Sequence, residues 1–104
     1  MKHKLKLPNK FVYMGYEFDI YGGHTGKGEG GIKNWGNVSF KDMTVRIHKG
    51  LHPSTAKATL MHELIHVIGI CSGAQFSEGQ IDAIAYGMIE IINNNGWFRD
   101  YFIR

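Results

Sequence analysis

The sequence predicts an α+β domain in which a small N-terminal antiparallel sheet, of about three strands, packs against two helices. Two observations lead to this prediction. Strand-like runs of aromatic and β-branched residues fill the first half of the chain, and a helical spacing of apolar residues takes over after Pro53. With 104 residues, 43% of them apolar, we expect residues 1–104 to form one domain.

The first half of the chain contains three candidate strands. Residues 11–21, in which apolar and acidic side chains alternate, form the first. Residues 32–40 and 43–48 form the other two, and the two residues between them suit a hairpin although they are not the preferred Asn-Gly or Asp-Gly. Residues 22–31 hold six glycines and no apolar side chain. They predict a mobile loop, because a phosphate-binding loop would need Walker spacing and an apolar helix directly after it.

The second half contains two candidate helices and an aromatic tail. Pro53, followed by two hydroxyl residues, starts a helical pattern that continues until Gly69 and Gly73 stop it. Ser77–Gln80 has the Ser-x-x-Gln form of a capping box and predicts a second helix, which runs to about Asn94. Residues 96–104 are too aromatic for a free terminus, so we expect them to fold back onto the sheet or the helices.

Charge and cysteine content narrow the possible partners and compartments. Residues 1–60 carry ten Lys or Arg against four Asp or Glu, and residues 61–104 carry two against five, so the halves are about +6 and −3. The basic residues are scattered rather than gathered with aromatics in a stripe, so nucleic acid is not the expected partner. A single cysteine, a start without a signal sequence, and the lack of a run of roughly 20 apolar residues predict a cytoplasmic protein with no membrane partner.

The first helix contains a His-Glu-x-x-His motif from His62 to His66. Positions i and i+4 of a helix lie on one face, so both imidazoles can reach one cation, with Glu63 beside them. Imidazole nitrogens suit zinc, and a tetrahedral ion with two or three protein ligands keeps a position for water. Two core histidines are the alternative, but each would need a buried partner in an otherwise apolar helix. We therefore predict one zinc ion bound by His62 and His66.

A catalytic zinc ion needs a third protein ligand. Gly69 extends the motif toward the metzincin pattern, but the third histidine of that pattern would fall at Ser72. The other candidate is Glu78 in the first turn of the second helix, where the helix dipole favours the carboxylate form. Asp82 follows four residues later on the same face.

The Glu-x-x-x-Asp spacing is similar to that of gluzincins. The layout of residues 11–95 resembles small gluzincin-type metallopeptidases, particularly the ImmA/IrrE-like proteins often carried by phages and mobile elements. This resemblance implies a zincin-like domain that hydrolyses peptide bonds of a protein substrate, for which it suggests a transcriptional repressor. It also implies that His62, His66 and Glu78 are the zinc ligands. Glu63 would then be the general base, and Asp82 would support a zinc-binding histidine.

Two other functions stay open on the sequence. The chain could be a regulatory or binding module that keeps zinc but turns over little, because so small a domain offers a shallow cleft that excludes water poorly. It could also be a basic nucleic-acid accessory protein with incidental histidines. An extended substrate would add to a sheet edge, and we favour residues 43–48 because they directly precede the zinc helix. The sequence does not specify an oligomeric state.

Several other side chains are weaker candidates for the site. Tyr86 and Cys71 could approach the metal, but we expect both to pack in the interior. His24, His48 and His52 are expected to be exposed residues of loops or strands. No residue is predicted to stabilise the oxyanion.

Overall fold

The computed structural model describes residues 7–23 and 35–103. These residues form seven elements: β1 (Lys10–Tyr13), β2 (Tyr16–Gly23), β3 (Gly36–Ser39), β4 (Thr44–His48), α1 (Pro53–Ser72), α2 (Glu78–Asn94) and α3 (Trp97–Phe102). The α+β class is confirmed. Within the described residues, however, the sheet has four strands rather than three and is mixed rather than antiparallel, and there are three helices rather than two. Most of the predicted glycine-rich loop, with His24, lies outside the described residues.

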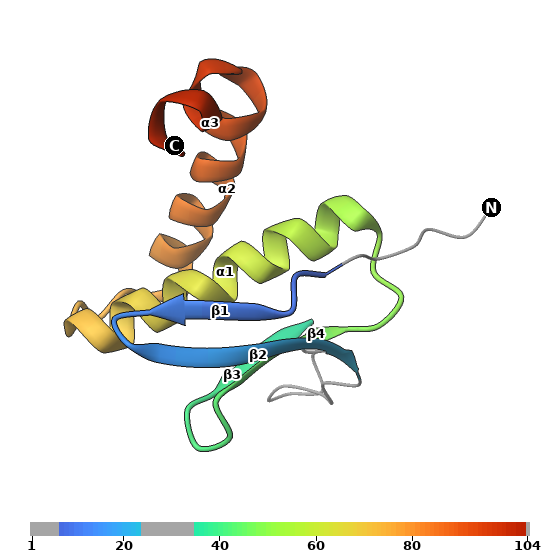
Figure 1. The fold of residues 1–104 in the computed structure, drawn as a ribbon, viewed down its shortest axis with the longest axis vertical. Coiled ribbons are helices and arrows are strands. Elements are labelled where there is room, and N and C mark those ends of the chain that lie inside the picture. Colours follow the sequence, from blue (N-terminus) through green and yellow to red (C-terminus); the bar gives the residue numbers. More distant parts are fainter. Residues whose placement is uncertain (1–6, 24–34, 104) are drawn as a thin grey trace.

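The four strands lie in the order β1-β2-β4-β3 (Figure 1). β1 pairs antiparallel with β2, and β3 with β4, but β2 and β4 run parallel, with Ile20 beside Val45. A parallel pair needs a long connection, and the segment between β2 and β4, which includes β3, supplies it. The alternation of side chains tells which face of a strand is buried but not which strand lies beside it. The β3–β4 hairpin was therefore predictable, and the parallel pair was not.

The predicted strand over residues 11–21 is in fact two strands joined by a tight turn. Met14 and Gly15 have positive φ angles of 51° and 85°, the conformation of the two central residues of a type I′ hairpin turn. Met-Gly is not a typical pair for this turn, and the aromatic residues continue on both sides of it, so the sequence pattern hides the break. The β3–β4 turn is also longer than predicted and occupies residues 40–43.

One face of the sheet packs against α1. Alternate residues of β2 and β4 form a buried cluster with two residues of α1: Phe18, Ile20, Val45, Ile47, Ala56 and Val67. α1 is also apolar on another side, where Ile65 packs against Ile81 and Ala85 of α2. The helix that carries the His-Glu-x-x-His motif is therefore held by the sheet and by α2, as expected for a helix that is apolar nearly all round.

The two long helices begin and end as predicted. α1 begins at Pro53, and Gly73 ends it with a left-handed φ of 78°. Gly69 was also predicted to stop the helix, but it lies buried within α1. The capping box before α2 is complete, because the Gln80 amide donates to Ser77 Oγ at 3.1 Å and the Ser77 amide donates to Gln80 Oε1 at 2.8 Å. These two caps define the short α1–α2 turn and so set where Glu78 stands relative to α1.

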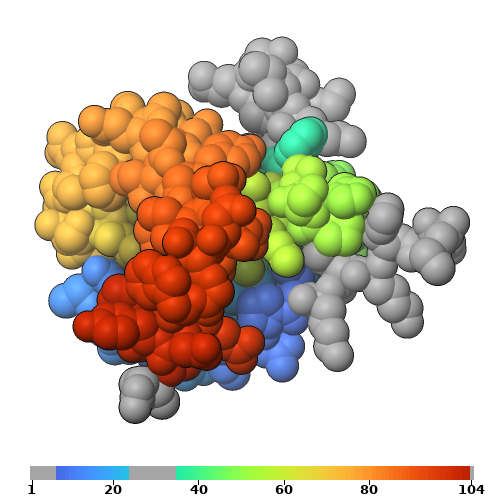
Figure 2. All heavy atoms as spheres, turned by 90° about the horizontal axis from the view of Figure 1, so that it is seen from above, coloured from blue at the N-terminus to red at the C-terminus, as the bar shows by residue number. Residues whose placement is uncertain are grey.

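The second half of α2 and α3 project away from the sheet (Figure 1), and in the view from above α3 lies in front of the rest of the chain (Figure 2). The prediction that the aromatic tail folds back onto the body of the protein is wrong for α3, because none of its residues is buried. Its rings contact one another instead, with the Phe98 and Phe102 centroids 4.6 Å apart. Aromatic content predicts that a segment needs a covering surface, but it does not say which surface.

Candidate metal centre

His62 and His66 lie one turn apart on α1, and their ring centroids are 4.9 Å apart. Their side chains are 19% and 28% exposed, so both rings are partly enclosed but open to solvent on one side. Since α1 is held by both the sheet and α2, the backbone under the two rings is well supported. The i, i+4 spacing therefore places both imidazoles on one face of α1, as predicted from the sequence.

Glu78 brings a carboxylate from α2 to both imidazoles. Its Oε1 is 3.1 Å from His62 Nε2, and its Oε2 is 3.1 Å from His66 Nε2. Ligand atoms of the three residues lie within 4.8 Å of one another. Two ligands bound at about 2.0–2.1 Å to a tetrahedral ion stand about 3.3 Å apart, which is close to each of the two 3.1 Å histidine–carboxylate distances. We call His62, His66 and Glu78 the metal group, because together they could hold a metal ion.

The position of Glu78 follows from the start of α2. Glu78 is the first residue of the helix after the Ser77 cap, where unpaired backbone N–H groups and the helix dipole favour a negative charge. Its side chain is 72% exposed. An ion held by the metal group would therefore remain accessible to water and to a second molecule.

Asp82 stands behind His62, one turn further along α2. Its Oδ1 is 2.7 Å from His62 Nδ1. A neutral imidazole carries one N–H, and donation from Nδ1 to Asp82 leaves the Nε2 lone pair, on the side of Glu78, available to a metal. This is the contact that the resemblance implied for Asp82.

Glu63 is the buried residue of the motif, with 6% of its surface exposed. It faces β3, because a β-carbon added at Gly36 would lie 3.1 Å from its Oε2. Burial raises the pKa of the Glu63 carboxyl to about 7; the nearby His62 lowers this pKa and Glu78 raises it further. A carboxyl that titrates near neutral pH can both accept and release a proton under physiological conditions.

Gly36 is absent from the site residues that the sequence predicts. It begins β3, and a β-carbon there would lie only 2.7 Å from Thr59 Cγ2 as well as against Glu63. Only glycine lets the strand approach α1 this closely. A glycine within a strand-like run is a known sign of close backbone approach, so residues 32–40 did contain a signal.

The strand order shows that the predicted peptide-binding edge is wrong. Residues 43–48 cannot accept an added strand, because β4 pairs with β2 on one side and with β3 on the other. In the described sheet, β3 is the edge strand on the side of Glu63. The sequence pattern placed the hairpin correctly but could not tell which of its two strands faces outward.

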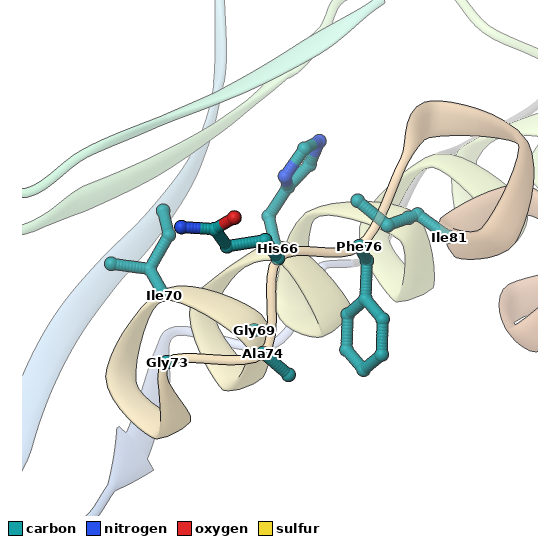
Figure 3. A pocket seen from close by; sticks show the side chains of 8 residues that line it. His66, Gly69, Ile70, Gly73, Ala74, Phe76 and Ile81 are labelled. Carbon is teal, nitrogen blue, oxygen red and sulfur yellow. The ribbon is translucent and has the colours of Figure 1, made fainter.

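A pocket of about 300 Å³ adjoins the metal group (Figure 3). It is lined by the end of α1, the α1–α2 turn and the start of α2. His66 borders it, and Ile70, Phe76 and Ile81 give it an apolar lining. A pocket of this size takes a side chain rather than a large ligand.

The weaker candidates have other roles. Cys71 is half-buried against the sheet core, as expected. The packing expected of Tyr86 is wrong, since its side chain is 62% exposed on α2. His52 caps α1, because its Nδ1 accepts a hydrogen bond from the Ser54 amide at 3.2 Å. The His48 amide donates to the Trp35 carbonyl at 2.8 Å, which extends the β3–β4 pairing.

No family model, curated protein or solved structure matches this chain. The site is therefore described by its residues alone. Two imidazoles and a carboxylate could hold a metal ion, and beside them lies a buried carboxyl with a pKa of about 7. None of the described helices is both long enough and apolar enough to cross a membrane.

Proposed function

We propose that this chain is a zinc-dependent metallopeptidase similar to the small gluzincin-type, ImmA/IrrE-like enzymes. The observation that carries the proposal is the metal group, with Asp82 bonded to the ring of His62. Two histidines and one glutamate are a donor set used by catalytic zinc, which keeps a further position for water. Magnesium and calcium prefer oxygen donors, so the two imidazoles favour zinc.

In the proposed reaction, Glu63 is the general base. When bound, zinc supplies a Lewis acid that activates water and polarises a peptide carbonyl. Glu63 accepts a proton from the attacking water and delivers it to the leaving amine. Asp82 keeps the His62 ring in the tautomer whose Nε2 can bind the ion.

The proposed substrate is an extended segment of a protein, such as the transcriptional repressor that the resemblance suggests. An added strand at the β3 edge would run beside Glu63, because Gly36 lies against this carboxylate. Backbone pairing gives affinity with little dependence on sequence. The pocket beside His66 would add selectivity for an apolar side chain near the scissile bond.

A second candidate function is a zinc-containing binding module with little turnover. It is favoured by the 72% exposure of Glu78, because a site this open excludes water poorly. Both functions require the metal group, and only the peptidase requires Glu63 as a base. The two are therefore separated by measuring zinc binding and hydrolysis on the same variants.

Zinc binding is measured first. We expect the purified chain to carry about one equivalent of zinc, and Glu78→Gln to weaken zinc binding by more than the roughly 10- to 100-fold typical of a supporting residue. Glu90→Gln is the matched control, because Glu90 is an exposed glutamate of the same helix outside the metal group. Equal zinc affinity of the two variants would rule out Glu78 as a ligand.

Hydrolysis is measured second, with zinc-loaded protein and a fluorogenic peptide library that varies the residues around the cleaved bond. We expect cleavage beside apolar residues. Glu63→Gln should keep one equivalent of zinc but lose about 10²- to 10⁴-fold in rate. If this variant cleaves as fast as the parent, Glu63 is not the base. The same test includes a repressor protein if one is encoded by a neighbouring gene. If the parent binds zinc and cleaves neither the peptides nor such a protein, the chain is the binding module.

A further inference from the structure

Residues 84–103, which we call the arm, carry an unusual amount of exposed apolar surface. They comprise α2 from Ile84 onward and all of α3, and their C-terminal part projects from the rest of the protein (Figure 1). Eight large apolar side chains of the arm are 38–72% exposed: Ile84, Tyr86, Ile91, Ile92, Trp97, Tyr101, Phe102 and Ile103.

α3 is not held in place by burial. It has six residues, none of them buried, and its Gly96 cap makes no side-chain hydrogen bond. A helix this short is unstable in water unless a tertiary surface covers one of its faces. The contacts among its own rings, such as Trp97 with Tyr101 at 6.3 Å, leave most of their area exposed. The described residues supply no such covering surface for α3.

An apolar groove lies next to the arm, where α1 and α2 diverge. It has a volume of about 320 Å³ and is lined by Leu60, Met61 and Leu64 of α1 and by Ile89 and Ile92 of α2. Ile92 belongs both to the groove and to the exposed side chains of the arm. One chain therefore presents a recess and, beside it, a protruding set of aromatic rings.

The exposed apolar area approaches what a stable dimer buries on each partner. An aromatic side chain has about 150–250 Å² of surface, so the 57–72% exposure of Trp97, Tyr101 and Phe102 corresponds to about 400 Å². Ile84 and Tyr86 lie two positions apart on α2 and therefore face nearly opposite sides, so one partner cannot cover all eight side chains. Without Tyr86, the other seven expose on the order of 750 Å², compared with about 800 Å² per partner in a standard interface.

The charge of the arm favours an identical partner. Its ionisable residues are Glu90, Arg99 and Asp100, so both signs are present and the net charge is −1. Two copies can meet with little repulsion, and Arg99 can face an acidic residue of the other copy. A membrane surface or a nucleic acid would instead require an excess of lysine and arginine.

We propose that the arm and the groove form a two-fold symmetric dimer interface, in which the aromatic rings of each arm fill the groove of the other copy. In such an isologous contact, the same patch serves both subunits, which suits a chain that carries both a recess and a protrusion. The proposal does not rest on the peptidase function, because the metal group lies at the opposite end of α2.

The direct test is the mass of the full chain in solution, measured by sedimentation velocity from about 1 to 100 µM. We expect a species of twice the 11.8 kDa chain mass. Tyr101→Lys, at the most exposed ring, should raise the dimer dissociation constant at least about 30-fold. Val12→Lys is the matched control, since Val12 is 64% exposed on β1 and receives the same charge. The control should remain dimeric.

Three results would overturn the proposal: a monomer at 100 µM, which would assign the arm to a different partner; aggregates without a discrete dimer; or equal dissociation constants for the two lysine variants. A second measurement avoids mutation of the arm. Trp35→Phe leaves Trp97 as the only tryptophan, and its emission should shift to the blue over the concentration range in which the mass doubles. An emission that stays constant through the mass change places the interface elsewhere.

Discussion

Replacement of Glu63 by glutamine should change how the stability of the metal-free protein depends on pH. Burial raises the pKa of Glu63 from its ordinary value of 4.5 to about 7 in the folded protein. At about 1.4 kcal/mol per pH unit, this difference corresponds to about 3 kcal/mol in the free energy of unfolding. That is a large fraction of the 5–15 kcal/mol typical of a small domain.

The sign of the effect follows from proton uptake. Between pH 4.5 and 7 the unfolded chain has released the Glu63 proton and the folded chain has kept it, so the unfolded state binds fewer protons. Stability therefore falls as the pH rises through this window. The full cost of the buried charge is present above about pH 7 and is absent below about pH 4.5. Glutamine has nearly the same shape and cannot ionise, so the variant lacks this cost at every pH.

The assay is equilibrium urea denaturation of chelator-treated protein at several values between pH 5 and pH 8. We expect the difference in unfolding free energy, Glu63→Gln minus parent, to grow by about 2–3 kcal/mol over this range, which shifts the urea midpoint by about 1–2 M. Taking the difference cancels the contributions of groups that the substitution leaves unchanged. Glu90→Gln, an exposed glutamate on α2, should show no such growth. A pH-independent difference for Glu63→Gln would refute the reasoning that Glu63 is buried and protonated.

Asp82→Asn should weaken zinc binding by about 10- to 100-fold, because His62 loses its charged partner. Its far-UV circular dichroism spectrum should be unchanged, and the control Asp100→Asn on α3 should bind zinc as the parent does. Gly36→Ala should destabilise the fold by about 1–3 kcal/mol in thermal denaturation, because its β-carbon overlaps Thr59. Gly87→Ala, in open space within α2, should stabilise the fold by about 0.5–1 kcal/mol, and a loss of stability there would contradict the helical assignment. Ser77→Ala should cost about 1 kcal/mol of unfolding free energy through the lost capping box, and an unchanged melting temperature would show that α2 does not depend on it.

The helices and the metal group were predictable because their signals are local. The motif lies on one helix face, and the capping box fixes the first turn of α2, so the spacing from His66 to Glu78 limits where the carboxylate can go. Helix periodicity placed Asp82 on the same face of α2 as Glu78, and its contact with His62 was implied by the resemblance alone. A sequence pattern can indicate those features that are determined within the same segment of the chain.

The parts that were not predictable depend on segments distant in the sequence. The parallel pairing of β2 with β4 makes β3 the edge strand, and no alternation within either strand contains that information. The role of Gly36 depends on the same topology, because it matters only once β3 reaches α1. The direction taken by α3 depends on the surface that covers it, which is not specified by the residues of α3.

The metal group also has a mechanical consequence, because its residues come from two helices. The buried contact between α1 and α2 is formed by Ile65, Ile81 and Ala85, with Met61 and Phe76 packed against it. An ion held by both helices would act as a cross-link across this contact, and its binding energy would add directly to folding stability. Removal of a bound ion would therefore weaken the attachment of α2 to α1 and lower the free energy of unfolding.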